Sequence, residues 1–334
     1  MLKQRFGTAL LALGMSTAFF VATPSGAEAE TSVALVLPGS IADGGWNAGA
    51  YQGLKKLEGS DDFRTAFSEN VSQADIPRVV RGYADDGYDL IIGHGFQFGS
   101  LFAEISPDYP DQKFFATTSA PGGSEIPSNA MYLDARYPDV AYGAGTLAAH
   151  VSKSGNAVGV VGGGDNPITQ MMTGIFKASA EAAGDGIKGY AIITGDYNDA
   201  AKGREASATM IGNGADVIWH IADITGIGAV EGAASKGATV IGMFADQKEL
   251  APDNIAVSFV SNNAGLVEEV AKMVNSGSFE GGKSWVPELT FLWLTSYGSD
   301  QYNKDLISDD AWSQFQRTWN DIGTGKINSK SIAE

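Results

Sequence analysis

The sequence predicts an α/β protein made of two doubly wound lobes, each built around a parallel sheet. Short runs rich in Val and Ile alternate with stretches of helical periodicity, and glycine closes several of those stretches. The alternation runs from Glu30 to Tyr137 and again from Val140 to Gln247. Because open α/β sheets bind ligands at the carboxyl ends of their strands, two such lobes indicate a clamshell with a ligand between them.

The N-terminus has the pattern of a secretory signal peptide. Lys3 and Arg5 precede an apolar run, and Ala27-Glu28-Ala29 supplies small residues for cleavage. The alternative is a membrane anchor, but the apolar run is short for a membrane span. We therefore predict a cleaved signal over residues 1–29 and a periplasmic mature protein. The absence of cysteine excludes disulfides, thiol chemistry and a lipidated cysteine.

The formal net charge of −17 at pH 7 argues against polyanionic partners. A strongly acidic chain repels phosphate backbones and anionic membranes, so a nucleic acid polymer is not expected to bind. The same charge favours a soluble monomer.

The predicted strands are mostly unbroken apolar runs, as expected for strands that a parallel sheet buries on both faces. In chain order they are 32–37, 88–92, 113–118, 156–161, 188–193, 216–220, 239–244 and 255–260. The predicted helices lie between them at 46–57, 76–83, 140–152, 169–183, 200–212, 226–235 and 266–275. In the first helix Ala50, Leu54 and Leu57 share an apolar face, which should pack on the sheet.

Motifs for metal, nucleotide and covalent chemistry are absent. The histidines at 94, 150 and 220 lack the spacing of metal ligands. The glycine-rich stretches 159–167 and 323–327 lack the dinucleotide and P-loop patterns, and no nucleophile elbow occurs. No metal or cofactor is therefore expected. A pair of catalytic carboxylates stays open as an alternative, although no two acidic residues stand out as partners.

Aromatic and polar residues at strand ends are the candidates for ligand binding. Flat rings suit a planar ligand, and buried polar groups set its specificity. The candidate site residues are Asp43, Trp46, Asn47, His94, Phe96, Asp223, Phe244 and Asp246. The alternative for Trp46 and Phe244 is packing between the lobes, and the alternative for His94 is a structural hydrogen bond.

Four segments together resemble the basic membrane protein family of ABC-transporter substrate-binding proteins. VALVLPGSIADGGWNAGAYQGLKKLE begins at Val33, and IIGHGFQFG begins at Ile91. NAVGVVGG precedes Pro167, and DYNDAAKGREASATMIGNGADVIWHIAD is followed by IGMFADQ. The resemblance covers essentially the whole chain after residue 29.

The resemblance implies a type I periplasmic-binding fold, with lobes joined by three crossovers. It implies lobes of residues 30–138 plus 262–284 and 139–261 plus 285–334, with the third crossover at Ile255–Ser261. It also implies a purine nucleoside or nucleobase ligand, delivered to the membrane permease of an ABC importer. Trp46 would stack on the ring, Asn47 would contact base or sugar, and Asp246 would lie in the cleft.

The chain departs from the family pattern at three positions. Phe244 replaces an Asp associated with ribose hydroxyls, Ser261 replaces a common Lys, and Asp223 replaces a Gly. A free base or another small heterocycle is therefore an alternative to a nucleoside, and a sensory receptor partner is an alternative to an importer. The aromatic stretch after Trp285 is expected either to line the cleft or to cover the C-terminal lobe.

Overall fold

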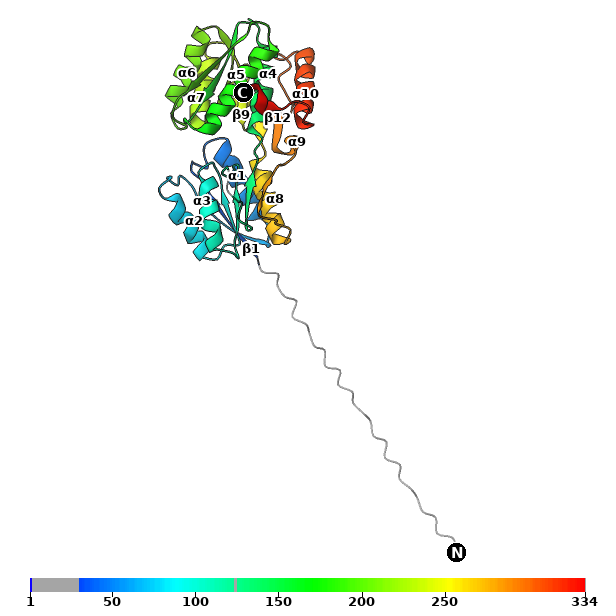
Figure 1. The fold of residues 1–334 in the computed structure, drawn as a ribbon. Helices are drawn as coiled ribbons and strands as arrows, with labels where there is room; N and C mark the ends of the chain where they lie inside the picture. The colour runs from blue at the N-terminus through cyan, green and yellow to red at the C-terminus, as the bar shows by residue number, and fades with distance from the viewer. Residues whose placement is uncertain (2–29, 123–124, 334) are drawn as a thin grey trace.

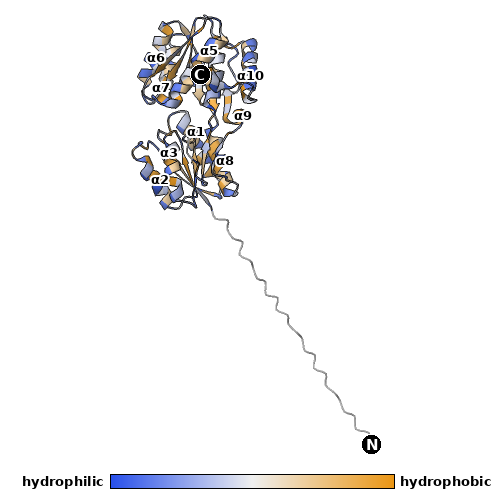
Figure 2. Cartoon of the chain, viewed as in Figure 1, coloured by the Kyte–Doolittle hydropathy of each residue, from blue (hydrophilic) through white to orange (hydrophobic). Residues whose placement is uncertain are grey.

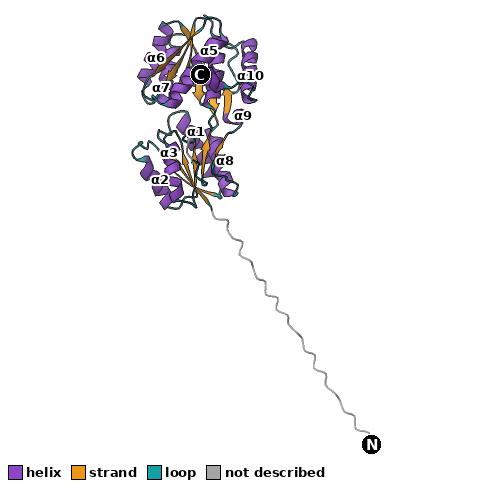
Figure 3. Cartoon of the chain, in the orientation of Figure 1, coloured by secondary structure: helices purple, strands orange, loops and turns teal. Residues whose placement is uncertain are grey.

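Two α/β lobes lie one above the other in the computed structural model, which describes residues 1, 30–122 and 125–333 (Figure 1). Each lobe has one six-stranded sheet with helices on both faces (Figure 3). The predicted fold class is confirmed. The predicted signal peptide lies outside the described residues. No helix among the residues described is long and apolar enough to cross a membrane.

The N-terminal sheet is parallel throughout, in the order β11-β5-β4-β3-β1-β2. Its strands are β1 (Thr31–Val36), β2 (Phe63–Ser68), β3 (Leu90–Gly93), β4 (Lys113–Ala116), β5 (Ala130–Leu133) and β11 (Lys283–Trp285). Its helices are α1 (Trp46–Leu57), α2 (Ile76–Asp85), α3 (Phe98–Ile105) and α8 (Asn263–Asn275), with the 3₁₀ turn η1 (Ser106–Asp108).

The strand period of two divides this lobe into two cores. Val33 and Leu35 of β1 face a cluster that includes Leu54 of α1. Ala34 and Val36 point the other way, into a cluster with α2 and α3. Successive strand side chains alternate between faces, so an unbroken apolar strand serves both layers. Figure 2 shows the same pattern, with hydrophobic residues concentrated on the central strands.

The C-terminal sheet has the order β12-β10-β9-β8-β6-β7 and is parallel except for β12, which runs antiparallel to β10. Its strands are β6 (Ala157–Gly162), β7 (Lys188–Ile193), β8 (Ala215–Ile221), β9 (Thr239–Phe244), β10 (Ile255–Ser261) and β12 (Trp293–Ser296). Its helices are α4 (Tyr137–Val151), α5 (Pro167–Ala183), α6 (Ala200–Gly212), α7 (Asp223–Ala234) and α10 (Asp309–Gly323). Short turns are η2 (Lys248–Leu250), α9 (Leu289–Leu292) and η3 (Ser329–Ala333).

The chain passes between the two sheets three times. It leaves the N-terminal sheet after β5, returns after β10 through α8, and leaves again after β11 through α9. The passage that follows Ile255–Ser261 is thus the second along the chain and not the third. The lobe boundaries given above stay a prediction at single-residue level.

Several elements are absent from the sequence prediction. The strand β2 is an edge strand with partly exposed side chains, so it lacks the long apolar run of a buried strand. The strand β5 is buried but only four residues long. The helix α7 begins at Asp223, earlier than predicted, and α3 was missed.

The C-terminal stretch covers its lobe instead of lining the cleft. The strand β12 pairs with β10, and the α10 side chain of Phe315 packs edge-on against Phe259 with ring centroids 5.8 Å apart. Trp312 of α10 stacks on Tyr302 at 4.2 Å. Of the two alternatives for this stretch, the covering role is the one found.

Candidate ligand-binding site

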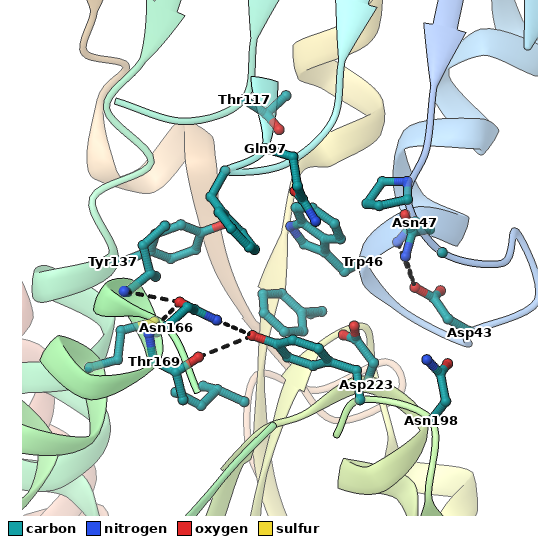
Figure 4. A pocket seen from close by; sticks show the side chains of 18 of the residues that line it. Asp43, Trp46, Asn47, Gln97, Thr117, Tyr137, Asn166, Thr169, Asn198 and Asp223 are labelled. Atoms are coloured by element: carbon teal, nitrogen blue, oxygen red, sulfur yellow. Dashed lines mark hydrogen bonds between the residues drawn. The ribbon is translucent and has the colours of Figure 1, made fainter. Parts of the chain in front are cut away.

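A cleft lies between the carboxyl ends of the two sheets (Figure 4). The N-terminal lobe contributes the segments after β1, β3 and β4, and the C-terminal lobe contributes those after β6, β7, β8 and β9. The side chains with polar groups or aromatic rings are Ser40, Asp43, Trp46, Asn47, Phe96, Gln97, Thr117, Tyr137, Asn166, Thr169, Tyr197, Asn198, Asp223 and Phe244. The mixture of aromatic rings, amides, hydroxyls and a few carboxylates is that of a small-molecule site.

Trp46 forms one wall of the cleft because His94 holds its indole from behind. The two rings stack with centroids 3.8 Å apart and an angle of 26°. The Nε2 atom of His94 lies 3.1 Å from the Trp46 carbonyl oxygen, and its Nδ1 lies 3.0 Å from the Thr117 hydroxyl. A carbonyl only accepts, so Nε2 donates and Nδ1 accepts. One indole face is therefore braced while the other faces the cleft.

Burial lowers the pKa of His94 and of His220 to about 4, well below the usual 6.5. His220 lies near the end of β8, and its Nε2 donates to Gln247 Oε1 at 2.8 Å. Both rings are therefore neutral at pH 7. In the unfolded chain they take up protons at a higher pH than in the folded protein, so acidification favours unfolding.

We expect the free energy of unfolding to decrease as the pH falls from about 6.5 towards 4. Each histidine contributes a slope of about 1.4 kcal/mol per pH unit, and the raised pKa of Asp223 opposes one of them. The net loss is then about 1.4 kcal/mol per unit, measurable as urea midpoints. His220→Gln should flatten the slope, whereas the control His150→Gln should keep most of it. Equal slopes in wild type and His220→Gln would contradict this account.

Asp43 organises the start of α1 and orients Asn47. Its carboxylate accepts the backbone N–H groups of Gly45, Asn47 and Ala48 at 2.7 to 3.0 Å. It also accepts the Asn47 side-chain Nδ2 at 2.8 Å. Asp43 and Asn47 are 5% and 3% exposed. All of Asp43's strong acceptor positions are therefore used within the protein, which makes it a positioning residue.

Two buried oxygens of the lining have no partner among the described residues, Asn47 Oδ1 and Gln97 Oε1. The Asn47 amide is fixed, because its nitrogen must face the Asp43 carboxylate. Its oxygen is therefore an acceptor directed away from Asp43. Buried polar atoms without partners are costly, so such atoms in a cleft point to a ligand that donates hydrogen bonds.

Tyr197 forms part of the opposite wall and is held by Asn166 and Thr169. Asn166 Nδ2 donates to the Tyr197 hydroxyl at 2.9 Å, and Thr169 Oγ1 lies 3.0 Å from it (Figure 4). The glycine-rich stretch after β6 makes room for this ring. A Cβ atom added at Gly163 would lie 2.2 Å from the nearest atom of the Tyr197 ring, and one added at Gly164 would lie 2.5 Å from it. The glycines therefore serve an aromatic wall and not a phosphate loop.

Asp223 and Phe244 stand at strand ends with left-handed backbones, at φ values of +47° and +70°. Non-glycine residues rarely adopt this conformation, and such strain clusters at functional sites. Burial, and then the charge of Asp43, raise the pKa of Asp223 to about 7. Its carboxylate accepts no hydrogen bond from the residues that the structure describes. Phe244 is backed by Trp293, with ring centroids 6.2 Å apart.

Trp293 also supports the cleft from the third passage between the lobes. It is 2% exposed, and its ring lies 6.0 Å from that of Tyr137. Its Nε1 donates to the Ala135 carbonyl in the first passage at 2.9 Å. The C-terminal aromatic stretch thus acts on the site indirectly, by backing two residues of its lining.

The cleft brings together most of the predicted site residues. Those that line it are Asp43, Trp46, Asn47, Phe96, Asp223 and Phe244. His94 lies behind Trp46, out of the lining. Asp246 is exposed outside the cleft, where it accepts hydrogen bonds from Ser296 Oγ at 2.8 Å and from the Lys248 N–H at 3.0 Å. Its expected position in the cleft is therefore wrong, because the chain has turned outward two residues after Phe244.

Several lining residues escaped the sequence prediction. Tyr137 lies at the start of α4 just after the first passage, and Tyr197 lies in the loop between β7 and α6. Their signal was the same as for the predicted set, an aromatic residue beyond a strand end. Asn166 was hidden as a helix cap, since its Oδ1 accepts the N–H groups of Ile168 and Thr169.

The lining contains no lysine, arginine or histidine. Among residues 30–122 and 125–333, no group of three acidic or histidine side chains is placed to hold a metal ion. The arrangement offers aromatic faces, acceptor oxygens and hydroxyls. It is suited to holding an uncharged or cationic planar molecule that donates hydrogen bonds.

Comparisons with known proteins agree with this fold and show the family. The family model of the Bmp ABC transporter substrate-binding proteins, described as PnrA-like, matches residues 30–307. The ABC transporter nucleoside-binding protein BmpA of Lactococcus lactis is 25% identical over 317 residues, covering 87% of this chain and 86% of that protein. A purine-binding protein of Brucella abortus is 27% identical over 272 residues, covering 80% and 75%.

The fold is similar to that of a solved ABC transporter solute-binding protein from Aeropyrum pernix. The TM-score is 0.78 at 22% identity, with 89% of this chain and 92% of that chain covered. The matched family model spans most of the residues after position 29 and includes every residue of the cleft lining. The chain therefore belongs to the Bmp family of ABC transporter substrate-binding proteins.

Proposed function

We propose that the protein binds a purine-type ligand, a nucleoside or a free nucleobase, in the cleft between its lobes. The supporting observation is the pairing of flat rings with unpartnered acceptors. Trp46 and Tyr197 line the same space as the buried oxygens of Asn47 and Gln97. Stacking a base on an aromatic side chain contributes roughly 1–3 kcal/mol, and the acceptors match the N–H groups of a purine edge.

The relatives support the same ligand class. One is named a nucleoside-binding protein and another a purine-binding protein. The lining contains no basic residue, so the site disfavours an anionic ligand. A phosphate group would lie near Asp223 with no cation to compensate its charge. Nucleotides are therefore expected to bind much more weakly than the corresponding nucleosides.

As a member of this family the protein binds a solute outside the cytoplasm for an ABC transporter, and it is not an enzyme. We propose that it works as a periplasmic monomer. Ligand bridges the lobes, and the three passages between them bend as the cleft closes. The closed form then docks on the membrane permease. An adjacent sensor-kinase gene in place of permease and ATPase genes would instead favour a sensory role.

Mass spectrometry of the molecule released on denaturing freshly purified protein tests the ligand class. We expect a purine base or nucleoside in a stoichiometric amount. A purine without sugar would fit the replacement of a ribose-binding Asp by Phe244. A stoichiometric compound that is not a purine would overturn the proposed ligand class, although not the family assignment.

A further inference from the structure

The Asp223 carboxylate is the acidic group of the cleft that the protein itself leaves without a hydrogen-bond donor. Asp43, the other acid of the lining, is held by the N-terminus of α1. No donor to Asp223 exists among the described residues, and no cationic side chain lines the cleft. The ionisable groups that face it are Asp43 and the phenols of Tyr137 and Tyr197. None of these neutralises a carboxylate, so its partner must come from the ligand or from solvent.

The surroundings of Asp223 fit the edge of a flat ring. Figure 4 draws Asp223 on the C-terminal wall, with Trp46 and Asn47 across the cleft. Tyr197 belongs to the same lining, and its phenol is near Asp223. Aromatic faces on both sides favour a ring stacked between them, and a ring held in this way presents its hydrogen-bonding edge to a side chain at the rim of the stack. The backbone of Asp223 is in the left-handed conformation, which persists only where the surrounding structure enforces it, so the fold fixes this residue in place.

We propose that Asp223 reads the hydrogen-bonding edge of the heterocycle and that its protonation state decides which purine edge it accepts. This inference rests on the proposed function. An ionised carboxylate only accepts, so it pairs with two adjacent donors, as on the N1–H and amino edge of guanine. A protonated carboxyl donates and accepts, so it pairs with the N1 and amino edge of adenine.

Both forms of Asp223 are available near neutral pH. Burial and the nearby Asp43 raise its pKa to about 7. Between about pH 6 and pH 8 the ionised fraction changes by roughly tenfold, and the protonated fraction changes by the same factor in the opposite direction. The preference for guanine-type over adenine-type ligands should therefore rise with pH.

The test is calorimetric titration of ligand-free protein with guanosine and adenosine at about pH 6 and pH 8. The quantity of interest is the ratio of the two affinities, because pH effects on lobe closure or general stability cancel in it. We expect this ratio to shift by roughly a hundredfold towards guanosine at the higher pH, because the two fractions change by about tenfold in opposite directions. A wild-type ratio that does not change with pH would overturn the proposal.

Asp223→Asn should abolish the shift, because an amide donates and accepts at every pH. The variant should fold, since asparagine tolerates the left-handed backbone. It should favour adenosine at both pH values. The matched control Asp246→Asn, at a strand end outside the cleft, should keep the wild-type shift. A shift that persists in Asp223→Asn would assign the effect to another group. If neither these nucleosides nor the free bases guanine and adenine bind at either pH, the purine proposal itself fails.

Discussion

Replacing Trp46 with alanine should weaken ligand binding by roughly tenfold to a hundredfold. The change removes the stacking face, which contributes roughly 1–3 kcal/mol for a base. In the wild-type protein the indole stacks on the His94 ring, with centroids 3.8 Å apart. The substitution therefore also removes the ring that covers His94. The measurement is titration of ligand-free protein with the ligand recovered from the native preparation. Because Trp46 is only partly buried, the variant should still fold.

The matched control is Trp46→Phe, which keeps a smaller flat ring on the same wall. It should recover most of the affinity, whereas a purely volume-filling role would be served equally by leucine. Trp46→Leu therefore separates stacking from packing. Unchanged affinity in Trp46→Ala, with normal folding, would remove Trp46 from the proposed site.

Replacing Asp43 with alanine should have the largest effect on stability and should also impair binding. Its loss leaves the first N–H groups of α1 and the Asn47 amide without their acceptor, in a buried position. Loss of a helix cap costs about 1 kcal/mol and a buried group without a partner about 1–3 kcal/mol, so the free energy of unfolding should fall by about 2–4 kcal/mol. Urea unfolding measures the fall.

Binding should fall at least tenfold in the same variant, because Asn47 loses the contact that fixes its oxygen. The control is Asp199→Ala, which removes a comparable cap from α6 at a partly buried position outside the cleft lining. That change should cost about 1 kcal/mol of stability and leave affinity unaltered. Wild-type affinity in a folded Asp43→Ala protein would show that Asn47 does not read the ligand.

The architecture was predictable because buried parallel strands have a strong sequence signature. Strands such as β1 and β6 are mostly apolar and buried along their whole length. The strands that the sequence does not predict are those that form only beside a neighbouring strand of the folded sheet. The strand β2 needs β1 beside it, and β12 joins its sheet only because β10 offers a free edge.

The site was predictable on one wall and less so on the other. Trp46 and Asn47 follow a glycine turn after the first strand, where few other roles fit. Tyr137 reaches the cleft from the start of α4 and Tyr197 from a loop, and tertiary packing on Trp293 and on Gly163 positions their rings. Asp246 illustrates the opposite error. The sequence locates it after a strand end, but hydrogen bonds from Ser296 at the end of β12 and from the Gly298 N–H hold it outside the cleft.

The three passages of the chain determine when each lobe can be completed during synthesis. The N-terminal sheet needs β11, which ends at Trp285, and its α1 packs on α8, which follows the whole central part of the other lobe. The C-terminal sheet needs β12 and then α10. Neither lobe is one continuous piece of chain, so a ribosome-bound fragment that stops before α8 contains no finished domain. Both lobes can therefore be completed only late in translation, once the segments that close their sheets have left the ribosome.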